Sequence, residues 1–222
     1  MKILIKKYKH VWVLSYVFLY VTWFYTLEKA VTTNYTLIHI PLDDMIPFSE
    51  WFVFPYYLWF IYIFATVSYF FFTSKDDFYK CTAFLFIGMT VCLIIYTIWP
   101  NGQNLRPDIS RLGRDNILTR IVARLYSSDT ATNVFPSIHV FNSIGAHIAI
   151  HHSEALKKHK WIQISSFLLM ILICLSTMFL KQHSASDAIA SIVLSFVMYL
   201  LVYSWSGSRN ADKVKAKKLF AQ

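Results

Sequence analysis

The sequence predicts an all-α, polytopic membrane protein with six transmembrane helices in one bundle and both termini in the cytoplasm. Hydrophobic residues make up 56% of the 222 residues and charged residues only 15%, with only 5 glycines, a composition far from that of an average soluble domain. Apolar stretches of about 20 residues, the length that crosses a bilayer, recur along the chain. Basic residues gather in alternate connections between these stretches.

The predicted spans differ in polarity, and the difference points to function. We place them at residues 11–27, 51–72, 79–99, 136–151, 161–180 and 184–205. The fourth is the least hydrophobic, because it contains His139, Asn142, Ser143 and His147. Polar side chains at membrane depth normally face the interior of the bundle or a water-filled cavity. We therefore expect the fourth helix to carry part of a functional site.

The distribution of basic residues predicts the orientation of the chain. If the amino terminus is inside, 14 of the 21 lysines and arginines lie in inner segments. These are Lys2, Lys6, Lys7, Lys9, Lys75, Lys80, Lys157, Lys158, Lys160, Arg209, Lys213, Lys215, Lys217 and Lys218. The positive-inside rule then places both termini in the cytoplasm. We expect residues 1–222 to form a single membrane-embedded domain with a short basic cytoplasmic tail at residues 206–222.

The charge and the cysteines exclude other classes of function. The net charge of +9 comes largely from lysines beside the predicted spans, where anionic lipid headgroups would meet them, so we do not expect nucleic-acid binding. Cys81, Cys92 and Cys174 lie in or beside apolar spans and lack the paired spacing of metal ligands. Neither a disulfide nor a zinc site is predicted.

Three polar groups lie at the outer ends of the predicted helices. Pro136-Ser137-Ile138-His139 opens the fourth span, His183 is followed four residues later by Asp187 at the start of the sixth, and Arg106 follows the third. The predicted topology places all three on the same side of the membrane. They can therefore contribute to one site.

This combination of residue types is suited to a phosphate. The first turn of a helix has unsatisfied N–H groups and a partial positive charge, and Pro136 suits that turn because a missing N–H costs nothing there. His183 and Asp187 would share a helix face, so the carboxylate can fix the tautomer and leave the other ring nitrogen free to attack phosphorus. Each motif alone could be a helix start or a buried polar pair, but the three together favour phosphate chemistry.

The motifs resemble those of the type 2 phosphatidic acid phosphatase superfamily, which includes vanadium haloperoxidases and lipid phosphotransferases. That superfamily is marked by Lys-x6-Arg-Pro, Pro-Ser-x-His and Ser-Arg-x5-His-x3-Asp. This chain has Arg106-Pro107, Pro136-Ser137-Ile138-His139, and Ser176 followed by His183 and Asp187 at the same spacings. The resemblance covers the third to the sixth predicted helix and implies a six-helix membrane enzyme.

Two positions depart from the family pattern. Trp99 replaces the lysine of the first motif, and Thr177 replaces the arginine of the third. Inositol phosphorylceramide and sphingomyelin synthases, which are lipid phosphotransferases of the superfamily, also depart from the phosphatase pattern in these motifs. Candidate replacements for the two missing cations are Lys181, Gln103, Asn104, Arg111 and Arg114.

The resemblance implies a role for each matching residue. His183 would be the nucleophile that forms a phosphohistidine, and Asp187 would orient it. His139 would protonate the leaving oxygen and then activate the acceptor. Arg106 and Ser137 would hold the non-bridging oxygens as charge develops on them. This scheme requires no metal ion and no other cofactor.

Three functions remain open at the level of sequence. The first is a lipid phosphatase, in which water resolves the phosphohistidine of a lipid phosphate ester or diphosphate. The second is a lipid phosphotransferase with a lipid hydroxyl as acceptor. The third is a non-catalytic lipid-binding membrane protein, which the two missing cations make conceivable. We expect a bacterial plasma membrane, with the active site on the extracytoplasmic side.

Overall fold

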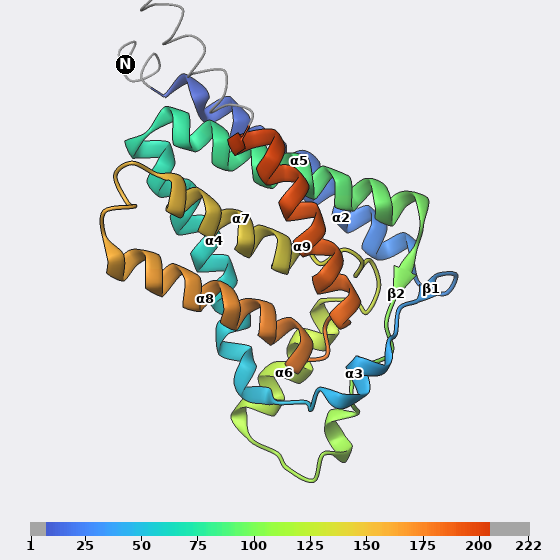
Figure 1. The fold of residues 1–222 in the computed structure, drawn as a ribbon. Coiled ribbons are helices and arrows are strands. Elements are labelled where there is room, and N and C mark those ends of the chain that lie inside the picture. Colours follow the sequence, from blue (N-terminus) through green and yellow to red (C-terminus); the bar gives the residue numbers. More distant parts are fainter. Residues whose placement is uncertain (1–7, 205–222) are drawn as a thin grey trace, which may run out of the picture.

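The computed structural model describes residues 8–204 as a bundle of helices (Figure 1). The predicted basic tail at residues 206–222 lies outside the described residues. The long helices are α2 (Tyr16–Ala30), α4 (Val53–Thr73), α5 (Lys75–Ile98), α7 (Ile138–His152), α8 (Lys160–Phe179) and α9 (Ala185–Tyr199). A 3-10 helix, Lys9–Ser15, leads into α2, and a π-helical turn, Leu200–Ser204, extends α9.

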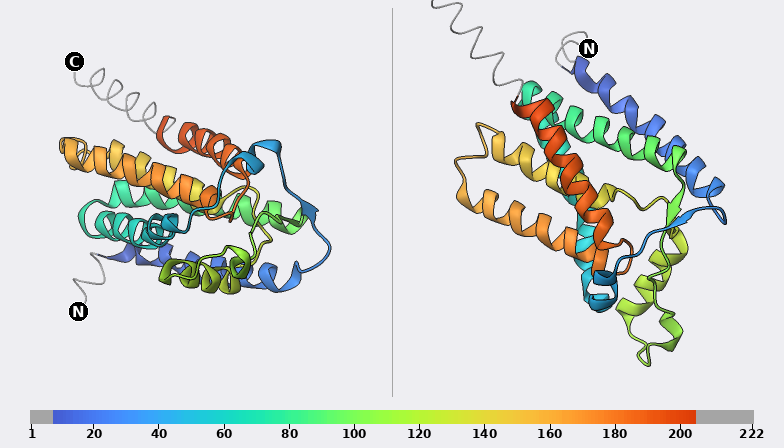
Figure 2. Two further views of the ribbon diagram at one scale, coloured as in Figure 1. Left: turned by 90° about the horizontal axis from the view of Figure 1, so that it is seen from below. Right: turned by 45° about the vertical axis from the view of Figure 1, so that its right-hand side comes forward.

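Helix α7 is the centre of the bundle and packs against α4, α5, α8 and α9 (Figures 1 and 2). Its close approach to α5 depends on two glycines. A Cβ at Gly145 would lie 2.6 Å from the ring of Phe84, and one at Gly88 would lie 1.9 Å from the ring of Phe141. The two phenylalanine rings stack with centroids 5.1 Å apart. The glycines therefore make room for an aromatic contact between α5 and α7.

Among residues 8–204, five helical stretches are long and apolar enough to span a membrane. They are Lys9–Ala30, Glu50–Thr73, Lys75–Ile98, Lys160–Phe179 and Ala185–Ser204. Helix α7, the predicted fourth span, has only 15 residues and is about 22 Å long at 1.5 Å per residue, shorter than a bilayer core of about 30 Å. The membrane-protein class is therefore supported, whereas the count of six spans is not confirmed.

The two ends of the described chain lie at the same end of the bundle. Figure 1 and the right-hand view of Figure 2 show the start of Lys9–Ser15 and the end of α9 there, away from α3 (Pro41–Met45) and α6 (Ile117–Ser128). The connections α4–α5 and α7–α8 lie at the same end as the chain ends. This arrangement agrees with an even number of crossings. The cytoplasmic location of the termini stays a prediction.

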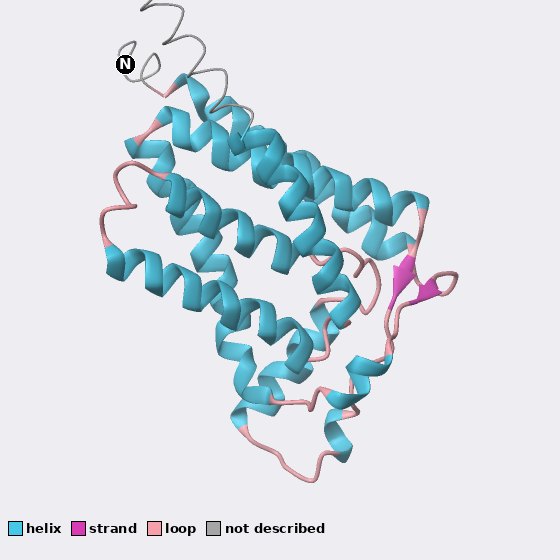
Figure 3. Ribbon diagram, in the orientation of Figure 1, coloured by secondary structure: helices cyan, strands magenta, loops and turns pink. Residues whose placement is uncertain are grey.

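The opposite end of the bundle carries short elements (Figure 3). Strands β1 (Thr36–Leu37) and β2 (Asn101–Gly102) pair in parallel, and 3-10 helices form at Glu50–Phe52 and Ile109–Arg111. Helix α6 was not predicted from the sequence. This helix buries Leu118, Val122 and Leu125 along one face, and Asn116 Oδ1 caps it by accepting from the N–H groups of Leu118 and Thr119 at 2.9 and 3.0 Å. Its polar residues on the other face keep its average hydropathy too low for a predicted span.

Candidate active site

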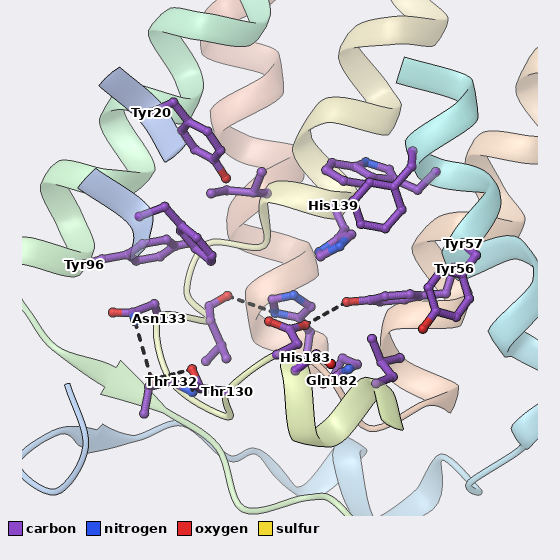
Figure 4. A pocket seen from close by; sticks show the side chains of 18 residues that line it. Tyr20, Tyr56, Tyr57, Tyr96, Thr130, Thr132, Asn133, His139, Gln182 and His183 are labelled. Carbon is purple, nitrogen blue, oxygen red and sulfur yellow. Dashed lines mark hydrogen bonds between the residues drawn. The ribbon is translucent and has the colours of Figure 1, made fainter. Parts of the chain in front are cut away.

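A cavity of about 500 Å³ lies among α2, α4, α5, α6 and α7, and both predicted histidines line it. The ring centroids of His139 and His183 are 5.8 Å apart. Figure 4 shows the two imidazoles on the cavity wall, with Tyr56 beside them and Tyr20 and Tyr96 on the other side. The structure thus brings together two rings that are 44 positions apart in the sequence.

The hydrogen bonds of His183 define its tautomer. Its Nδ1 lies 3.2 Å from Oδ2 of Asp187 and 3.0 Å from the carbonyl oxygen of Val134. Both partners are acceptors, so Nδ1 carries the proton and donates to them. The other ring nitrogen, Nε2, is then unprotonated. It keeps the lone pair that a nucleophile needs.

Asp187 is held in place by the start of α9. Its Oδ2 accepts from the backbone N–H of Ser184 at 3.0 Å, which completes a capping box at the first turn of the helix. The buried carboxylate of Asp43 fixes the same turn from outside, accepting from Ser184 Oγ at 2.7 Å and from the N–H of Ala185 at 2.8 Å. Asp43 could not be identified as a site residue from the sequence, because Ser184 and Ala185 are about 140 positions away from it.

Asn101 fixes the carbonyl group that helps to orient His183. The Oδ1 atom of Asn101, a fully buried residue, accepts from the N–H groups of Val134 and Phe135, both at 2.9 Å. Its Nδ2 donates to the carbonyl groups of Trp99 and Phe135. The loop that carries the Val134 carbonyl is therefore tied to the end of α5. Asn101 is a further residue that the motifs did not reveal.

His139 lies in the first turn of α7, and its ring packs between two aromatic side chains. Its centroid is 4.7 Å from that of Tyr56 and 4.4 Å from that of Trp59. Within residues 8–204, no group forms a hydrogen bond with either ring nitrogen. A ring held by stacking alone has both nitrogens available for proton transfer.

The structure corrects the expected start of the fourth helix. The helix begins at Ile138, not at Pro136, and Ser137 is its N-cap, with Oγ accepting from the N–H of Val140 at 3.4 Å. Pro136 therefore lies before the first turn. Ser137 is fully buried and does not line the cavity. Its hydroxyl group caps the helix that carries His139.

Arg106 lies behind the cavity wall rather than on it. Its guanidinium group donates to the carbonyl oxygens of Tyr126, Asp129 and Thr130 at 3.2, 2.8 and 2.7 Å, and to Oε1 of Gln182. These carbonyl groups lie at the end of α6 and just after it, where helical partners are lacking. Burial lowers the pKa of Arg106, and the nearby Asp129 acts in the opposite direction. In this arrangement Arg106 binds the chain itself.

The candidate replacement donors do not reach the histidines. Lys181 Nζ donates to the carbonyl oxygen of Asp43 at 2.6 Å, and Gln103 Nε2 donates to the carbonyl oxygen of Lys181 at 3.0 Å. Asn104 and Lys181 line a separate hollow next to α3. Arg111 and Arg114 form ion pairs with Asp108 and Glu50. The structure therefore does not place any of these side chains in the cavity.

The two departures from the motifs are accounted for by packing. Trp99 Nε1 donates to Thr36 Oγ1 at 2.8 Å, and the indole contacts the ring of Phe135. Thr177 is fully buried, and its hydroxyl group donates to the carbonyl oxygen of Cys174 at 2.8 Å. The carbonyl group of Thr177 accepts from the N–H groups of Gln182 and His183. Both positions thus stabilise the chain around the site without supplying a charge.

Two cavity residues that the sequence analysis missed offer hydrogen-bond donors. Gln182 and Trp59 line the cavity. Gln182 Nε2 and Trp59 Nε1 are buried and have no partner among the residues that the structure describes. Unpaired buried donors are rare and costly. They are therefore candidates to bind the oxygens of a ligand.

The described part of the chain contains no group of three or more histidine, cysteine, aspartate or glutamate side chains arranged to hold a metal ion. Cys81, Cys92 and Cys174 are free thiols. The independence from metal ions stays a prediction.

Together, the bundle and the site define a class: a helical membrane protein with a carboxylate-oriented histidine and a second histidine facing one cavity. Residues 103–211 match the family model described as PAP2 superfamily, in agreement with the resemblance of the motifs. This match indicates a lipid enzyme of the phosphatase or phosphotransferase type. Comparison with curated proteins and with solved structures finds no match.

The matched region and the rest of the chain contribute different parts of the cavity. His139, His183 and Gln182 lie within residues 103–211. Every phenylalanine, tryptophan and tyrosine on the cavity wall comes from before residue 103. These are Tyr20, Phe24, Tyr56, Tyr57, Trp59, Phe60 and Tyr96. The two histidines therefore belong to the matched region, and the aromatic wall belongs to α2, α4 and α5.

Proposed function

We propose that the protein is an integral membrane lipid phosphatase that hydrolyses a lipid phosphate ester or diphosphate through a phosphohistidine at the extracytoplasmic face of the plasma membrane. One observation carries the proposal. His183, with its tautomer set by Asp187 at 3.2 Å, shares a cavity with His139 at a ring-centroid distance of 5.8 Å. A phosphoryl group between the rings could contact both.

The geometry supports a two-step reaction. Nε2 of His183 attacks phosphorus, and the bond from phosphorus to the lipid oxygen breaks as protonated His139 gives its proton to that oxygen. Neutral His139 then takes a proton from water. The water oxygen attacks phosphorus, the bond from phosphorus to nitrogen breaks, and its electron pair returns to His183. Gln182 and Trp59 would donate to the phosphoryl oxygens as charge develops on them.

The test is turnover by the purified full-length protein in detergent with EDTA present, compared with His183→Ala. Lipid phosphates are supplied with and without a lipid alcohol, and free phosphate and new phospholipid are measured. We expect the wild type to release phosphate and His183→Ala to lose activity by at least about 10³-fold. Phosphate label from the substrate should be trapped in an acid-labile form on the wild type and not on His183→Ala. A His183→Ala protein with normal turnover would refute the proposal, and a new phospholipid product would identify a phosphotransferase.

A further inference from the structure

The ring of His139 is held by packing against α4. Tyr56 and Trp59 are three positions apart on that helix, so they lie on the same face of it. Both rings contact the imidazole, with centroids 4.7 and 4.4 Å from its own. Seven aromatic side chains line the cavity, and within residues 8–204 these are the two whose rings contact His139. The orientation of the proposed acid therefore depends on α4.

Tyr56 is the firmer of the two contacts, because it is anchored at both ends. The residue is only 1% exposed, and it packs in one hydrophobic cluster with Val122 and Leu125 of α6. Its hydroxyl group donates to Asp129 Oδ2 at 2.9 Å, a bond that Figure 4 marks with a dashed line. Trp59, in contrast, is half-buried, and its Nε1 has no partner among the residues that the structure describes. Tyr56 thus provides the rigid side of the contact.

Asp129 is itself fixed by α6 and by Arg106. It is the C-cap of α6, where its N–H donates to the carbonyl oxygen of Leu125 at 2.9 Å. Its own carbonyl oxygen accepts from Arg106 at 2.8 Å. The carboxylate that binds Tyr56 therefore belongs to a residue whose backbone is tied on both sides. The motif arginine is connected in this way, through Asp129 and Tyr56, to the ring of His139.

Proton donation depends on where the ring of His139 lies. A general acid must bring its N–H to within about 2.6–3.2 Å of the oxygen that leaves, and a displacement of about 1 Å can cost on the order of 10² in rate. An imidazole that no hydrogen bond holds is free to change its rotamer unless neighbouring groups fill the space around it. The ring of Tyr56 fills that space on one side.

We propose that Tyr56, held by Asp129, is a positioning residue that fixes the ring of His139 for proton donation to the leaving oxygen. This inference rests on the proposed function and adds two residues to its mechanism. In the first step, Nε2 of His183 forms a bond to phosphorus. The bond from phosphorus to the lipid oxygen breaks, its electron pair stays on that oxygen, and His139 supplies the proton. Tyr56 and Asp129 exchange no proton with the substrate; they set the position of the donor.

Two leaving groups of different basicity test this role. The alkoxide released from dioctanoyl phosphatidic acid needs a proton, whereas the phenolate released from 4-nitrophenyl phosphate departs without one. Because kcat/KM measures the steps from the free enzyme to the transition state, a displaced His139 slows cleavage of the first substrate and spares the second. Both substrates are given to the purified full-length protein in detergent micelles. Loss of folded protein or of phosphate binding would instead lower both values together.

Variants of Tyr56 should separate the two substrates. We expect Tyr56→Leu, which removes the ring, to lower kcat/KM for phosphatidic acid by on the order of 10²-fold, and Tyr56→Phe, which removes the hydrogen bond, by about 10-fold. Both should stay within about 2-fold of the wild type for 4-nitrophenyl phosphate. Tyr69→Phe is the matched control, because Tyr69 is 37% exposed and lies about 20 Å further along α4. Equal losses on the two substrates, or no loss on either, would contradict the inference.

Variants of Asp129 test the hydrogen bond to Tyr56. Asp129→Asn keeps an oxygen that can accept from the hydroxyl group, so it should retain the wild-type ratio of the two kcat/KM values, whereas Asp129→Ala should match Tyr56→Phe. The combined variant Tyr56→Phe with Asp129→Ala should lose no more than either substitution alone. Additive losses, or equal losses in Asp129→Asn and Asp129→Ala, would show that Asp129 does not act through this bond and would overturn the role of the pair.

A measurement without turnover separates this inference from the proposed function. The full-length protein is labelled with ¹³C-histidine, and the Cε1 resonance of His139 is assigned by its loss in His139→Gln. Two aromatic rings within 5 Å shift this resonance, so Tyr56→Phe and Asp129→Ala should move it and Asp129→Asn should not. If His139→Ala loses activity equally on both substrates, or if neither is hydrolysed, the proposed mechanism fails while the resonance still reports the contact. An identical resonance in the wild type and Tyr56→Leu would overturn the inference.

Discussion

Individual side chains around the cavity have roles that their residue types alone do not reveal. Arg106 and Ser137 belong to the motifs, yet one binds carbonyl groups behind the wall and the other caps α7. Gln182 and Trp59 belong to no motif, yet each keeps an unpaired donor at the cavity. A motif identifies which residues occur together, whereas the hydrogen bonds determine what each one contacts. The predictions at this scale therefore concern His183 and Arg106.

We expect Asp187→Asn to lower kcat by roughly 10²–10⁴-fold with little change in KM. An amide can present N–H toward Nδ1 of His183, which favours the wrong tautomer and places the proton on the nucleophilic nitrogen. Steady-state kinetics of the purified variant measure the effect. Asp44→Asn is the control, because it makes the same change at an aspartate whose side chain is 69% exposed and pairs with His39. A kcat within a few-fold of that of the wild type would show that Asp187 does not set the tautomer.

We expect Arg106→Lys to lower the free energy of unfolding by about 2 kcal/mol, because an ammonium group cannot make the four hydrogen bonds of the guanidinium fork. Thermal unfolding in detergent measures this change. Arg111→Lys is the control, since the side chain of Arg111 is 86% exposed and pairs with Asp108. Normal stability together with a raised KM would instead indicate that Arg106 binds the substrate.

At the scale of elements, the start of α9 is held in place by short segments that lie far from it in the sequence. Helix α3 supplies Asp43. Strand β2, which begins three residues after the end of α5, supplies Asn101, and this side chain anchors the loop before α7. These contacts connect the outer segments to the Asp187 and His183 pair. The geometry of the site therefore depends on how the outer segments are folded together.

We expect Asp43→Ala to destabilise the protein by about 2 kcal/mol and to lower kcat, because it leaves Ser184 Oγ and the N–H of Ala185 without their buried acceptor. Thermal unfolding and kcat are measured on the same preparation. The neighbouring Asp44→Ala is a matched control, since the side chain of Asp44 is 69% exposed. Equal effects of the two substitutions would argue against a specific role for Asp43.

The elements differ in how well the sequence predicts them. The long apolar helices were predicted to within a few residues, because twenty apolar residues in succession have few other structures available. Helix α6 was missed because its apolar residues lie on one buried face and do not form a continuous apolar stretch. The start of α7 was predicted two residues too early because Pro136 was assigned to the first turn of the helix. The spacing of the motifs predicted that His139, His183 and Asp187 lie close together, and the structure places them so. Asp43, Asn101 and the aromatic wall could not be predicted, since their contacts join segments far apart in the chain.

At the scale of the whole molecule, the central question is whether α7 crosses the membrane. It is enclosed by four helices that can shield its ends from lipid, so it can be shorter than a lipid-exposed span. A crossing would place the loop at η3 (Ile109–Arg111) and the α7–α8 connection on opposite sides. The positive-inside pattern assigns the second of these to the cytoplasm.

Two single-cysteine substitutions test this topology. We expect a membrane-impermeant maleimide to label Arg111→Cys in intact cells and Glu154→Cys only after permeabilisation, because both side chains are more than 80% exposed and flank α7 in the sequence. Labelling of the unsubstituted protein gives the background from Cys81, Cys92 and Cys174. Labelling of both positions from the outside would show that α7 does not cross, and would leave five spans.

The two histidines of the cavity and its aromatic wall come from different parts of the chain, which can therefore change separately. The imidazoles come from the matched region, and every aromatic side chain facing them comes from the amino-terminal helices. Exchange of residues on α2 and α4 can therefore alter the aromatic wall while His139 and His183 stay unchanged. Natural or engineered variants with new preferences should accumulate their changes in the first hundred residues, in the half of the chain that the family motifs do not cover.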